Sequence, residues 1–515
     1  MSHHTAHPHI RSIVIAGGGT AGWMVAAALS RTIAPHRCRI TLVESETIGT
    51  IGVGEATIPP IQTFNQVIGL DEAAFLQATK GTFKLGIEFA GWRARGHCYF
   101  HPFGRQGNDF AGTQFHQHWL RAQALGDDTP LGAFSLNEQA AYAGKMRRPE
   151  SDPRSVYSTF AYAYHFDAAL YAQHLRSLAE ARGVERREGL IEDVVLDGEN
   201  GRIACLQLDD GGMLDGDLFI DCTGLRSLLL GQALGVPFED WTHYLPCNRA
   251  LAVPTDCVDL MRPYTRSTAH AAGWQWRIPL QHRMGNGMVY SAEHWRDDQA
   301  HAALMANLDG QPLADPRLIR FTTGRRVQSW AKNCVAIGLS AGFLEPLEST
   351  SIHLVQIAVA KLLNWFPDTG FDPMTMAEFN RQIANEYDRI RDFLVLHYHA
   401  NERDGEAFWD QCRTSAIPDS LAEKITMFRR SGRLLSREAD LFQDASWLAV
   451  LLGQGIMPQA HDPLTESLRP LELDQMLRGM RELIARAAQA MPSQAEHLRS
   501  LGGEASSAPR EPALG

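Results

Sequence analysis

The spacing of apolar and small residues near the start of the chain predicts a strand, a turn and a helix in immediate succession. Residues 10–16 are a short apolar run rich in β-branched side chains, and residues 23–29 are rich in alanine, which favour strand and helix respectively. Between them, Gly17, Gly19 and Gly22 have the spacing G-x-G-x-x-G. Such a turn lets a pyrophosphate approach the backbone at the positive end of the helix dipole.

A second strand strengthens this prediction of a dinucleotide site. Residues 39–43 are mostly apolar, and Glu44 follows them 22 residues after Gly22, where a carboxylate can accept hydrogen bonds from ribose hydroxyls. The alternative interpretation is a glycine-rich turn that binds no ligand. The fingerprint by itself leaves FAD and NAD open.

Two later stretches alternate with the period of a strand. Apolar residues at 85, 87 and 89 alternate with Lys84, Gly86 and Glu88, which predicts one strand with Lys84 on the opposite face. The pattern alone favours a solvated surface lysine there. Trp274 and Trp276 share one face of a second strand, where they either line a pocket or pack a sheet on a helix.

The middle of the chain predicts mixed secondary structure. We expect a helix over residues 165–181, a pair of strands over 185–196, and a β-meander completed by 203–208 and 218–222. Residues 333–338 look like a third cofactor-type strand, and a helix follows over about 352–363. Residues 348–351 precede this helix, where N–H groups can hold an anion. The simpler interpretation makes Ser349 or Thr350 only a helix cap.

Together these elements predict an α/β, Rossmann-like fold of the FAD-binding two-dinucleotide type, with a β-sheet substrate region and a C-terminal helical region. We expect a flexible leader over residues 1–9 and an FAD-binding and substrate module over 10–365. Within this module the substrate region lies mainly at 60–165 and 245–330. A helical region over 366–491 and a disordered tail over 492–515 complete the prediction.

Composition narrows the function. The 515 residues carry a net charge of −11, which disfavours a nucleic-acid partner. The eight cysteines have no C-x-x-C or metal-ligand spacing, so we expect no metal site and reduced thiols in a cytoplasmic protein. Apolar runs stay shorter than about 18 residues, and the first residues lack the apolar core of a signal peptide, so neither a membrane span nor secretion is expected.

Six motifs resemble those of the flavin-dependent tryptophan halogenases. They are G-G-G-T-A-G-W at 17–23, G-V-G-E-A-T-I-P at 52–59, T-F-K-L-G-I at 82–87, Y-F-H-P-F at 99–103, W-Q-W-R-I-P at 274–279 and E-P-L-E-S-T at 345–350. The resemblance spans about residues 10–365. It implies a halogenase that uses FADH2 from a separate flavin reductase, O2 and chloride or bromide to make hypohalous acid for an aromatic small-molecule substrate. It is also compatible with a homodimer.

The resemblance also implies roles for individual residues. Lys84 and Glu348 correspond to the catalytic pair, which places Lys84 in the active site rather than on the surface. Thr350 and Ser351 correspond to the halide site. The substrate residues implied are His101, Phe103, Trp274, Trp276 and Ser349. The cofactor-binding residues implied are Gly17, Gly19, Thr20, Ala21, Gly22, Glu44, Glu55, Ala56, Ile191, Gly338, Leu339 and Ile352.

Two departures from the family pattern bear on specificity. Ser351 stands where the tryptophan enzymes usually have glycine, which bears on halide preference. The stretch 430–455 lacks the tyrosines with which those enzymes hold the amino-acid end of tryptophan, so we expect an electron-rich arene such as an indole. The alternatives are a single-component flavin aromatic hydroxylase, although residues 338–342 lack its usual G-D-A-A-H-like turn, and a non-catalytic flavin-binding protein.

Overall fold

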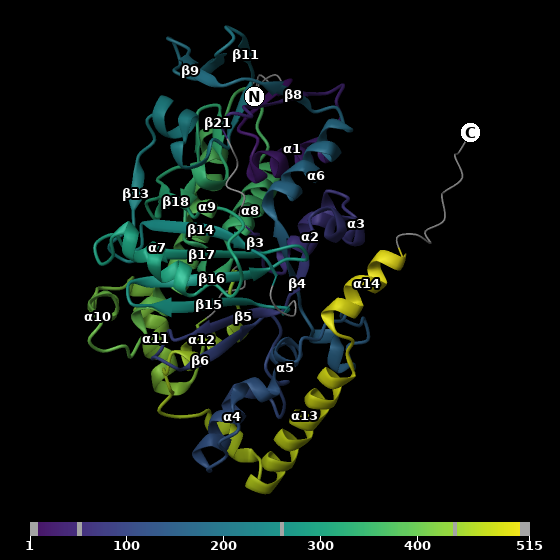
Figure 1. The fold of residues 1–515 in the computed structure, drawn as a ribbon, viewed down its shortest axis with the longest axis vertical. Coiled ribbons are helices and arrows are strands. Elements are labelled where there is room, and N and C mark those ends of the chain that lie inside the picture. Colours follow the sequence, from purple (N-terminus) through teal and green to yellow (C-terminus); the bar gives the residue numbers. More distant parts are fainter. Residues whose placement is uncertain (1–8, 49–53, 258–261, 436–439, 505–515) are drawn as a thin grey trace, which may run out of the picture.

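A computed structural model describes residues 9–48, 54–257, 262–435 and 440–504 (Figure 1). The glycine turn follows β1, an inner strand of a six-stranded sheet with the order β20-β21-β12-β1-β2-β8. All neighbouring strands in it are parallel except β20 and β21. The strands are β1 (Ser12–Ala16), β2 (Arg39–Glu44), β8 (Glu185–Glu188), β12 (Leu218–Asp221), β20 (Trp330–Ala331) and β21 (Cys334–Ala336).

A seven-stranded sheet with the order β18-β14-β17-β16-β15-β5-β6 forms the second layer. It is antiparallel except where β15 pairs with β5, and this one parallel pairing joins two segments that are far apart in sequence. The strands are β5 (Gly86–Ala90), β6 (Cys98–Pro102), β14 (Arg249–Thr255), β15 (Thr265–His270), β16 (Gly273–Pro279), β17 (Met284–Tyr290) and β18 (Arg317–Arg320).

Three small sheets complete the strand structure. The sheet β3-β7-β4 carries residues of both the 52–59 and the 82–87 motifs. The strands are β3 (Gly54–Ala56), β4 (Thr82–Lys84) and β7 (Ala163–Asp167); β9 (Ile191–Leu196), β10 (Ile203–Leu208) and β11 (Met213–Asp215); and β13 (Phe238–Asp240), β19 (Gly324–Arg326) and β22 (Gly342–Phe343).

The C-terminal helices lie beside the sheets, and Figure 1 shows α13 and α14 along one side of the molecule. The helices are α1 (Thr20–Thr32), α2 (Pro60–Val67), α3 (Glu72–Ala78), α4 (Phe115–Ala124), α5 (Leu136–Tyr142), α6 (Ala168–Glu180), α7 (Asp297–Ala306), α8 (Ser351–Asn364), α9 (Pro373–His399), α10 (Ala407–Thr414), α11 (Asp419–Ser431), α12 (Asp444–Gly453), α13 (Pro470–Ala490) and α14 (Gln494–Glu504).

The structure corrects several expectations in the first half of the chain. Residues 163–167 form β7, and the predicted helix begins only at Ala168, because the Asp167 side chain accepts hydrogen bonds from the first backbone N–H groups of α6. Residues 185–196 do not form a strand pair. Strand β8 joins β2 and β9 joins β10, while β12 belongs to the large parallel sheet rather than to the meander.

Two further expectations fail for tertiary reasons. The single strand predicted over residues 82–89 is interrupted at Leu85, so that β4 and β5 belong to different sheets. The predicted disordered tail begins with helix α14, whose Gln494 side chain accepts a hydrogen bond from the Phe83 backbone N–H at 2.8 Å. No helix within the described ranges has both the length and the apolarity to cross a bilayer.

Candidate active site

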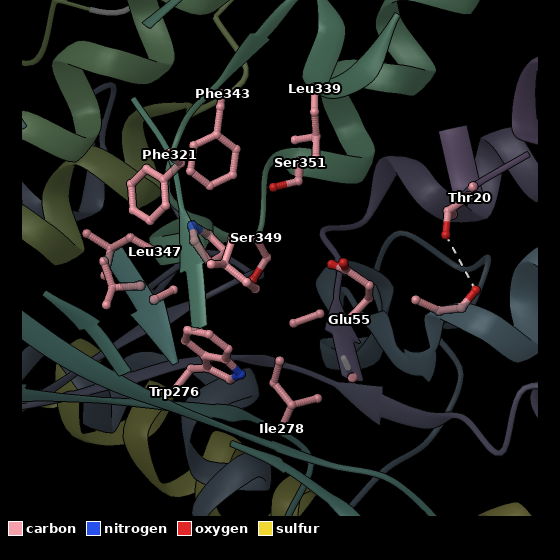
Figure 2. A pocket seen from close by; sticks show the side chains of 18 of the residues that line it. Thr20, Glu55, Trp276, Ile278, Phe321, Leu339, Phe343, Leu347, Ser349 and Ser351 are labelled. Carbon is pink, nitrogen blue, oxygen red and sulfur yellow. Dashed lines mark hydrogen bonds between the residues drawn. The ribbon is translucent and has the colours of Figure 1, made fainter. Parts of the chain in front are cut away.

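A cleft runs from the glycine turn to the two-tryptophan strand (Figure 2). Thr20 and Glu55 lie on one side of it, and Trp276, Phe321 and Phe343 face them from the other. The lining is mostly apolar and aromatic. The remaining predicted site residues on this lining are Gly19, Ala21, Ala56, Trp274, Leu339, Ser349 and Ser351.

The glycine turn has the geometry that a pyrophosphate needs. Gly17 has φ +106°, and a Cβ there would lie 2.3 Å from the Cys222 carbonyl oxygen, so only glycine fits. Around Gly19 no described atom lies within 4 Å of the position that a Cβ would take. Helix α1 begins directly after Gly19 and has no side-chain cap within the described structure. Its first N–H groups therefore face open space in which a phosphate fits.

The other predicted cofactor residues divide into two groups. Glu44 ends β2 beside this turn, where its carboxylate accepts from Arg186 at 2.6 Å. Gly338, with φ +77°, packs against Ala21, and Ile352 is buried in the first turn of α8. Ile191, however, starts β9 and is not part of the cleft lining. The β8 strand that precedes it is the one that borders Glu44.

Lys84 is completely buried, so the surface position suggested by the alternating pattern is wrong. Its ammonium donates to the Thr57 carbonyl oxygen at 3.0 Å and to the Ser349 hydroxyl at 2.7 Å. It also lies 5.1 Å from the centre of the Phe103 ring. Burial lowers the pKa of Lys84 to about 7, although the Glu348 carboxylate acts in the opposite direction.

Glu348 is also completely buried, and two histidines lie against its carboxylate. His101 Nδ1 lies 3.0 Å from each carboxylate oxygen, and His397 Nε2 lies 2.8 Å from Oε1. Burial raises the pKa of Glu348, but the two histidines together lower it further, to about 2. Glu348 is therefore an anion throughout the physiological pH range.

Two residues of this network escaped sequence reasoning. His397 and Tyr398 lie at the end of α9, more than 45 residues from the E-P-L-E-S-T motif. The Tyr398 hydroxyl donates to Glu345 Oε2 at 2.7 Å, and Trp274 Nε1 donates to the same oxygen at 3.0 Å. The helical period of α9 gives no sign of these roles, because a buried histidine or tyrosine usually belongs to the core.

The residues before α8 do not behave as a simple helix cap. Thr350 occupies the N-cap position, but its side chain makes no capping hydrogen bond, and its buried hydroxyl has no partner within the described part of the chain. Ser349 has the left-handed backbone conformation, with φ 60°. It lines the cleft and also accepts the hydrogen bond from Lys84. The interpretation as a cap alone is therefore wrong.

An aromatic cluster lies beside His101. The Phe393 ring stacks on Phe442 at 3.9 Å, meets Trp447 edge-on at 5.0 Å, and lies 5.7 Å from the His101 ring. Phe442 and Trp447 also line a second cavity. The stacked and edge-on rings beside His101 suit a planar arene, whereas the second cavity is also lined by the charged side chains of Arg389, Asp392, Glu423, Lys424 and Asp440.

The proposed catalytic residues lie apart from the lining of the cleft. Lys84, Glu348, His101 and Phe103 come together in the interior but are not among the residues that line the cleft. Ser349 joins the two groups, because it lines the cleft and accepts the hydrogen bond from Lys84. Across the described residues, the structure contains no group of three or more histidine, cysteine or acidic side chains placed to hold a metal ion.

Comparisons with known proteins agree with this arrangement. The family model for tryptophan halogenases matches residues 12–470. The tryptophan 6-halogenase SttH of Streptomyces toxytricini is 36% identical over 519 residues, which cover 95% of this chain and 98% of SttH.

Solved structures agree over nearly the whole chain. The flavin-dependent halogenase Xcc4156 of Xanthomonas campestris is 48% identical with a TM-score of 0.92, covering 96% of this chain and 98% of its own. BrvH, a flavin-dependent halogenase of Brevundimonas sp. BAL3, is 47% identical with a TM-score of 0.93, covering 96% and 100%. These matches favour a halogenase over a single-component hydroxylase or a non-catalytic flavin protein. The chain belongs to the tryptophan halogenase family and is a flavin-dependent halogenase.

Proposed function

We propose that this enzyme halogenates an electron-rich arene, and that Lys84 delivers the halogen while Glu348 assists. The observation that supports this most is the position of Ser349, which lines the cleft and also accepts a hydrogen bond from Lys84 at 2.7 Å. A small oxidant formed on the cleft side reaches Lys84 by passing this residue, whereas an arene beside His101 stays separated from the cleft.

The cleft fits FAD. The uncapped start of α1 and the open space at Gly19 suit the pyrophosphate, Glu44 suits the ribose, and Trp274 and Trp276 form an apolar wall at the far end. When bound and reduced, the flavin supplies the electrons with which O2 converts halide to hypohalous acid. We assign the halide to the backbone N–H groups of Thr350 and Ser351 at the start of α8, which is a 14-residue helix.

At the arene, one carbon–hydrogen bond is replaced by a carbon–halogen bond. The Lys84 ammonium donates a hydrogen bond to hypohalous acid, which makes its halogen more electrophilic and its oxygen a better leaving group. The arene carbon takes the halogen, the oxygen leaves as water, and the ring loses its proton. Glu348 is an anion of low basicity, so we assign to it chiefly the electrostatic stabilisation of the positive charge that develops on the ring.

The substrate is an arene without the amino-acid group of tryptophan. In the stretch 430–455, Asp440 is already paired with Arg389 at 3.1 Å and Lys424 at 3.2 Å. Phe442 and Trp447 present apolar rings to the arene site instead. Residues 436–439, which include two charged side chains of this stretch, lie outside the described residues. The cavity beside Phe442 is lined by the charged side chains of Arg389, Glu423 and Lys424 as well as by the two rings, so it suits a polar extension of a larger molecule that carries the indole.

A turnover assay tests the proposal. Purified enzyme with FAD, an added flavin reductase, NADH, O2 and bromide should convert indole to bromoindole, and kcat/KM for indole should equal or exceed that for L-tryptophan. A kcat/KM for L-tryptophan at least 10²-fold higher, about 2.7 kcal/mol of preferential transition-state binding, would overturn the substrate assignment. Hydroxylated product without halide would support a hydroxylase instead.

A separate reductase is the second part of the proposal. The chain has one complete G-x-G-x-x-G fingerprint, and the cleft at this fingerprint accounts for one dinucleotide. Enzyme with FAD but without reductase should therefore oxidise NADH and NADPH no faster than FAD alone does. Rapid oxidation of either nicotinamide would contradict it.

Light scattering in the same buffer tests the homodimer, which we propose from the family resemblance.

Halide preference is the third part. Ser351 begins α8 and lines the cleft, so its side chain lies next to the proposed halide site. Ser351→Gly should change the ratio of chlorinated to brominated product in equimolar halide by at least threefold. Ser349→Gly gives no such shift if the halide rests on Thr350 and Ser351 as proposed, although it lowers the overall rate.

A further inference from the structure

The last turn of α9 contacts both glutamates of the segment 345–348. His397 approaches Glu348 at 2.8 Å, and the next residue, Tyr398, donates to Glu345 at 2.7 Å. One end of a single helix therefore fixes two acidic side chains that lie three residues apart. Glu348 belongs to the arene site, whereas the contacts of Glu345 lead toward the flavin cleft.

Glu345 is completely buried. Its Oε2 accepts hydrogen bonds from both Trp274 Nε1 and Tyr398, and its Oε1 has no partner in the described part of the chain. Trp274 lines the cleft, and its ring lies 6.0 Å from that of Trp276. Behind it the Trp92 ring lies 6.1 Å away, and Trp92 meets the His397 ring at 6.0 Å. Trp274 is thus the outer layer between the cleft and the Glu348 site.

The orientation of a buried indole ring is fixed by its packing and by the hydrogen bond that its single N–H group donates. The Trp274 N–H is buried, and Glu345 is its acceptor. Leaving that N–H unsatisfied would carry the desolvation penalty of a buried donor, which alternative ring positions would partly recover. Tyr398 matters in turn because its hydroxyl fixes the carboxyl group from the side of α9.

We propose that Glu345 and Tyr398 are positioning residues that hold the Trp274 indole in place as the wall between the flavin cleft and the arene site. This inference rests on the proposed function, because it assumes that oxidant forms on the cleft side and is used beyond the wall. The consequence is better coupling, in the sense of more halogenated product for each O2 consumed.

Glu345 also makes the wall sensitive to pH. Burial raises the pKa of Glu345 to about 7, although the Trp274 and Tyr398 donors act in the opposite direction. The other titratable groups that interact with Glu345 are Tyr398, Cys247 and Cys412, and the pKa of each is raised above its ordinary value. These three stay neutral near pH 7. As pH rises through 7, Glu345 becomes a carboxylate and accepts stronger hydrogen bonds.

The first experiment needs no turnover. The indole ¹H–¹⁵N signal of Trp274, assigned with Trp274→Phe, should move with a midpoint near pH 7 in the full-length, flavin-free protein. Glu345→Gln should abolish this titration. Glu386→Gln is the matched control, because Glu386 is a buried acid of α9, the helix that carries Tyr398, and its substitution should leave the titration unchanged. A Trp274 signal that ignores pH in the wild type, or titrates in Glu345→Gln, would overturn the inference.

The second experiment measures coupling. Tyr398→Phe should lower bromoindole formed per O2 consumed at least threefold at pH 8, with FAD affinity within twofold of the wild type. Glu345→Gln, whose amide oxygen still accepts from Trp274, should lose the rise in coupling between pH 6 and pH 8. Unchanged coupling in Tyr398→Phe would overturn the inference. Wild-type enzyme that makes no bromoindole would instead refute the proposed function, while the Trp274 titration still decides the positioning role.

Discussion

At Lys84, burial and charge act on the same amine in opposite directions. Desolvation lowers its pKa from 10.5 to about 7, and the Glu348 carboxylate limits the decrease. Between pH 7 and 10.5 the unfolded chain binds a proton that the folded chain does not, so stability attributable to Lys84 increases as pH rises across this window. Below pH 7 the full cost of a buried ammonium applies, which is about 5 kcal/mol for this shift.

Lys84→Met should therefore stabilise the fold, and more so at low pH. From the pKa shift, the difference in unfolding free energy between variant and wild type should be about 3 kcal/mol larger at pH 6 than at pH 9. Urea denaturation at the two pH values measures it. The variant should lose halogenation at least 10³-fold and keep FAD binding. A stability difference that does not depend on pH would show that burial imposes no cost on the Lys84 ammonium. Product formation at the wild-type rate would show that Lys84 is not catalytic.

Glu348 sets the charge that Lys84 experiences. Glu348→Gln should lower kcat for bromination by about 10²–10³, a typical cost for removing a group that acts in the transition state. Because the carboxylate raises the pKa of Lys84, the variant should also lose activity at a lower pH on the alkaline side. A complete pH–rate profile measures both effects. An unchanged alkaline limb would contradict the coupling of the two residues.

At the scale of elements, the segment between β22 and α8 decides how the site is assembled. Glu345 precedes a short 3₁₀ turn that ends with Glu348, and Ser349 follows this turn with φ 60°. A left-handed conformation at a non-glycine residue is strained. Here it accompanies the placement of the Ser349 hydroxyl against Lys84, while Thr350 and Ser351 start α8.

Two substitutions at Ser349 separate strain from chemistry. Both Ser349→Ala and Ser349→Gly remove the hydroxyl that accepts from Lys84, so both should lower halogenation. Glycine also relieves the left-handed strain, and Ser349→Gly should be about 1 kcal/mol more stable than Ser349→Ala. Thermal or urea unfolding measures the difference. Equal stability of the two variants would show that the φ of 60° imposes no cost.

At the scale of the whole molecule, the C-terminal helices are part of the site's support. The Gln494 side chain of α14 accepts a hydrogen bond from the Phe83 N–H, and the His497 ring lies 5.3 Å from the Phe83 ring. Phe83 precedes Lys84 in β4. The last helix therefore braces the strand that carries the proposed catalytic lysine, more than 400 residues away in the chain.

Two truncations test this support. Deleting the chain from Pro492 onward removes α14 and leaves the Phe83 N–H buried without a partner, so stability should fall by at least 1–3 kcal/mol, with reduced halogenation. Deleting from Ala505 onward keeps every contact of α14 described here, so it should change neither property. Urea unfolding and indole bromination measure the two effects. Equal behaviour of both truncations would contradict a supporting role for α14.

The sequence by itself determined the elements whose signal is local. The spacing of Gly17, Gly19 and Gly22 predicted the turn, because backbone freedom and close approach need glycine at those positions. The alternation of Trp274 and Trp276 predicted a shared face, and the family motifs identified the halogenase and its proposed lysine and glutamate. These features depend on neighbours within a few residues, and their spacing is visible in one dimension.

Only the tertiary structure decided what surrounds those residues. A period of two could not show that the strand breaks at Leu85 or that Lys84 is buried, because the groups that enclose the lysine come from distant segments. His397 and Tyr398 lie in a helix whose apolar periodicity predicts ordinary core positions for them. Their roles arise only because α9 packs against the segment 345–348. Long-range packing determines burial, protonation and hydrogen-bond partners, and none of these leaves a periodic trace in the chain.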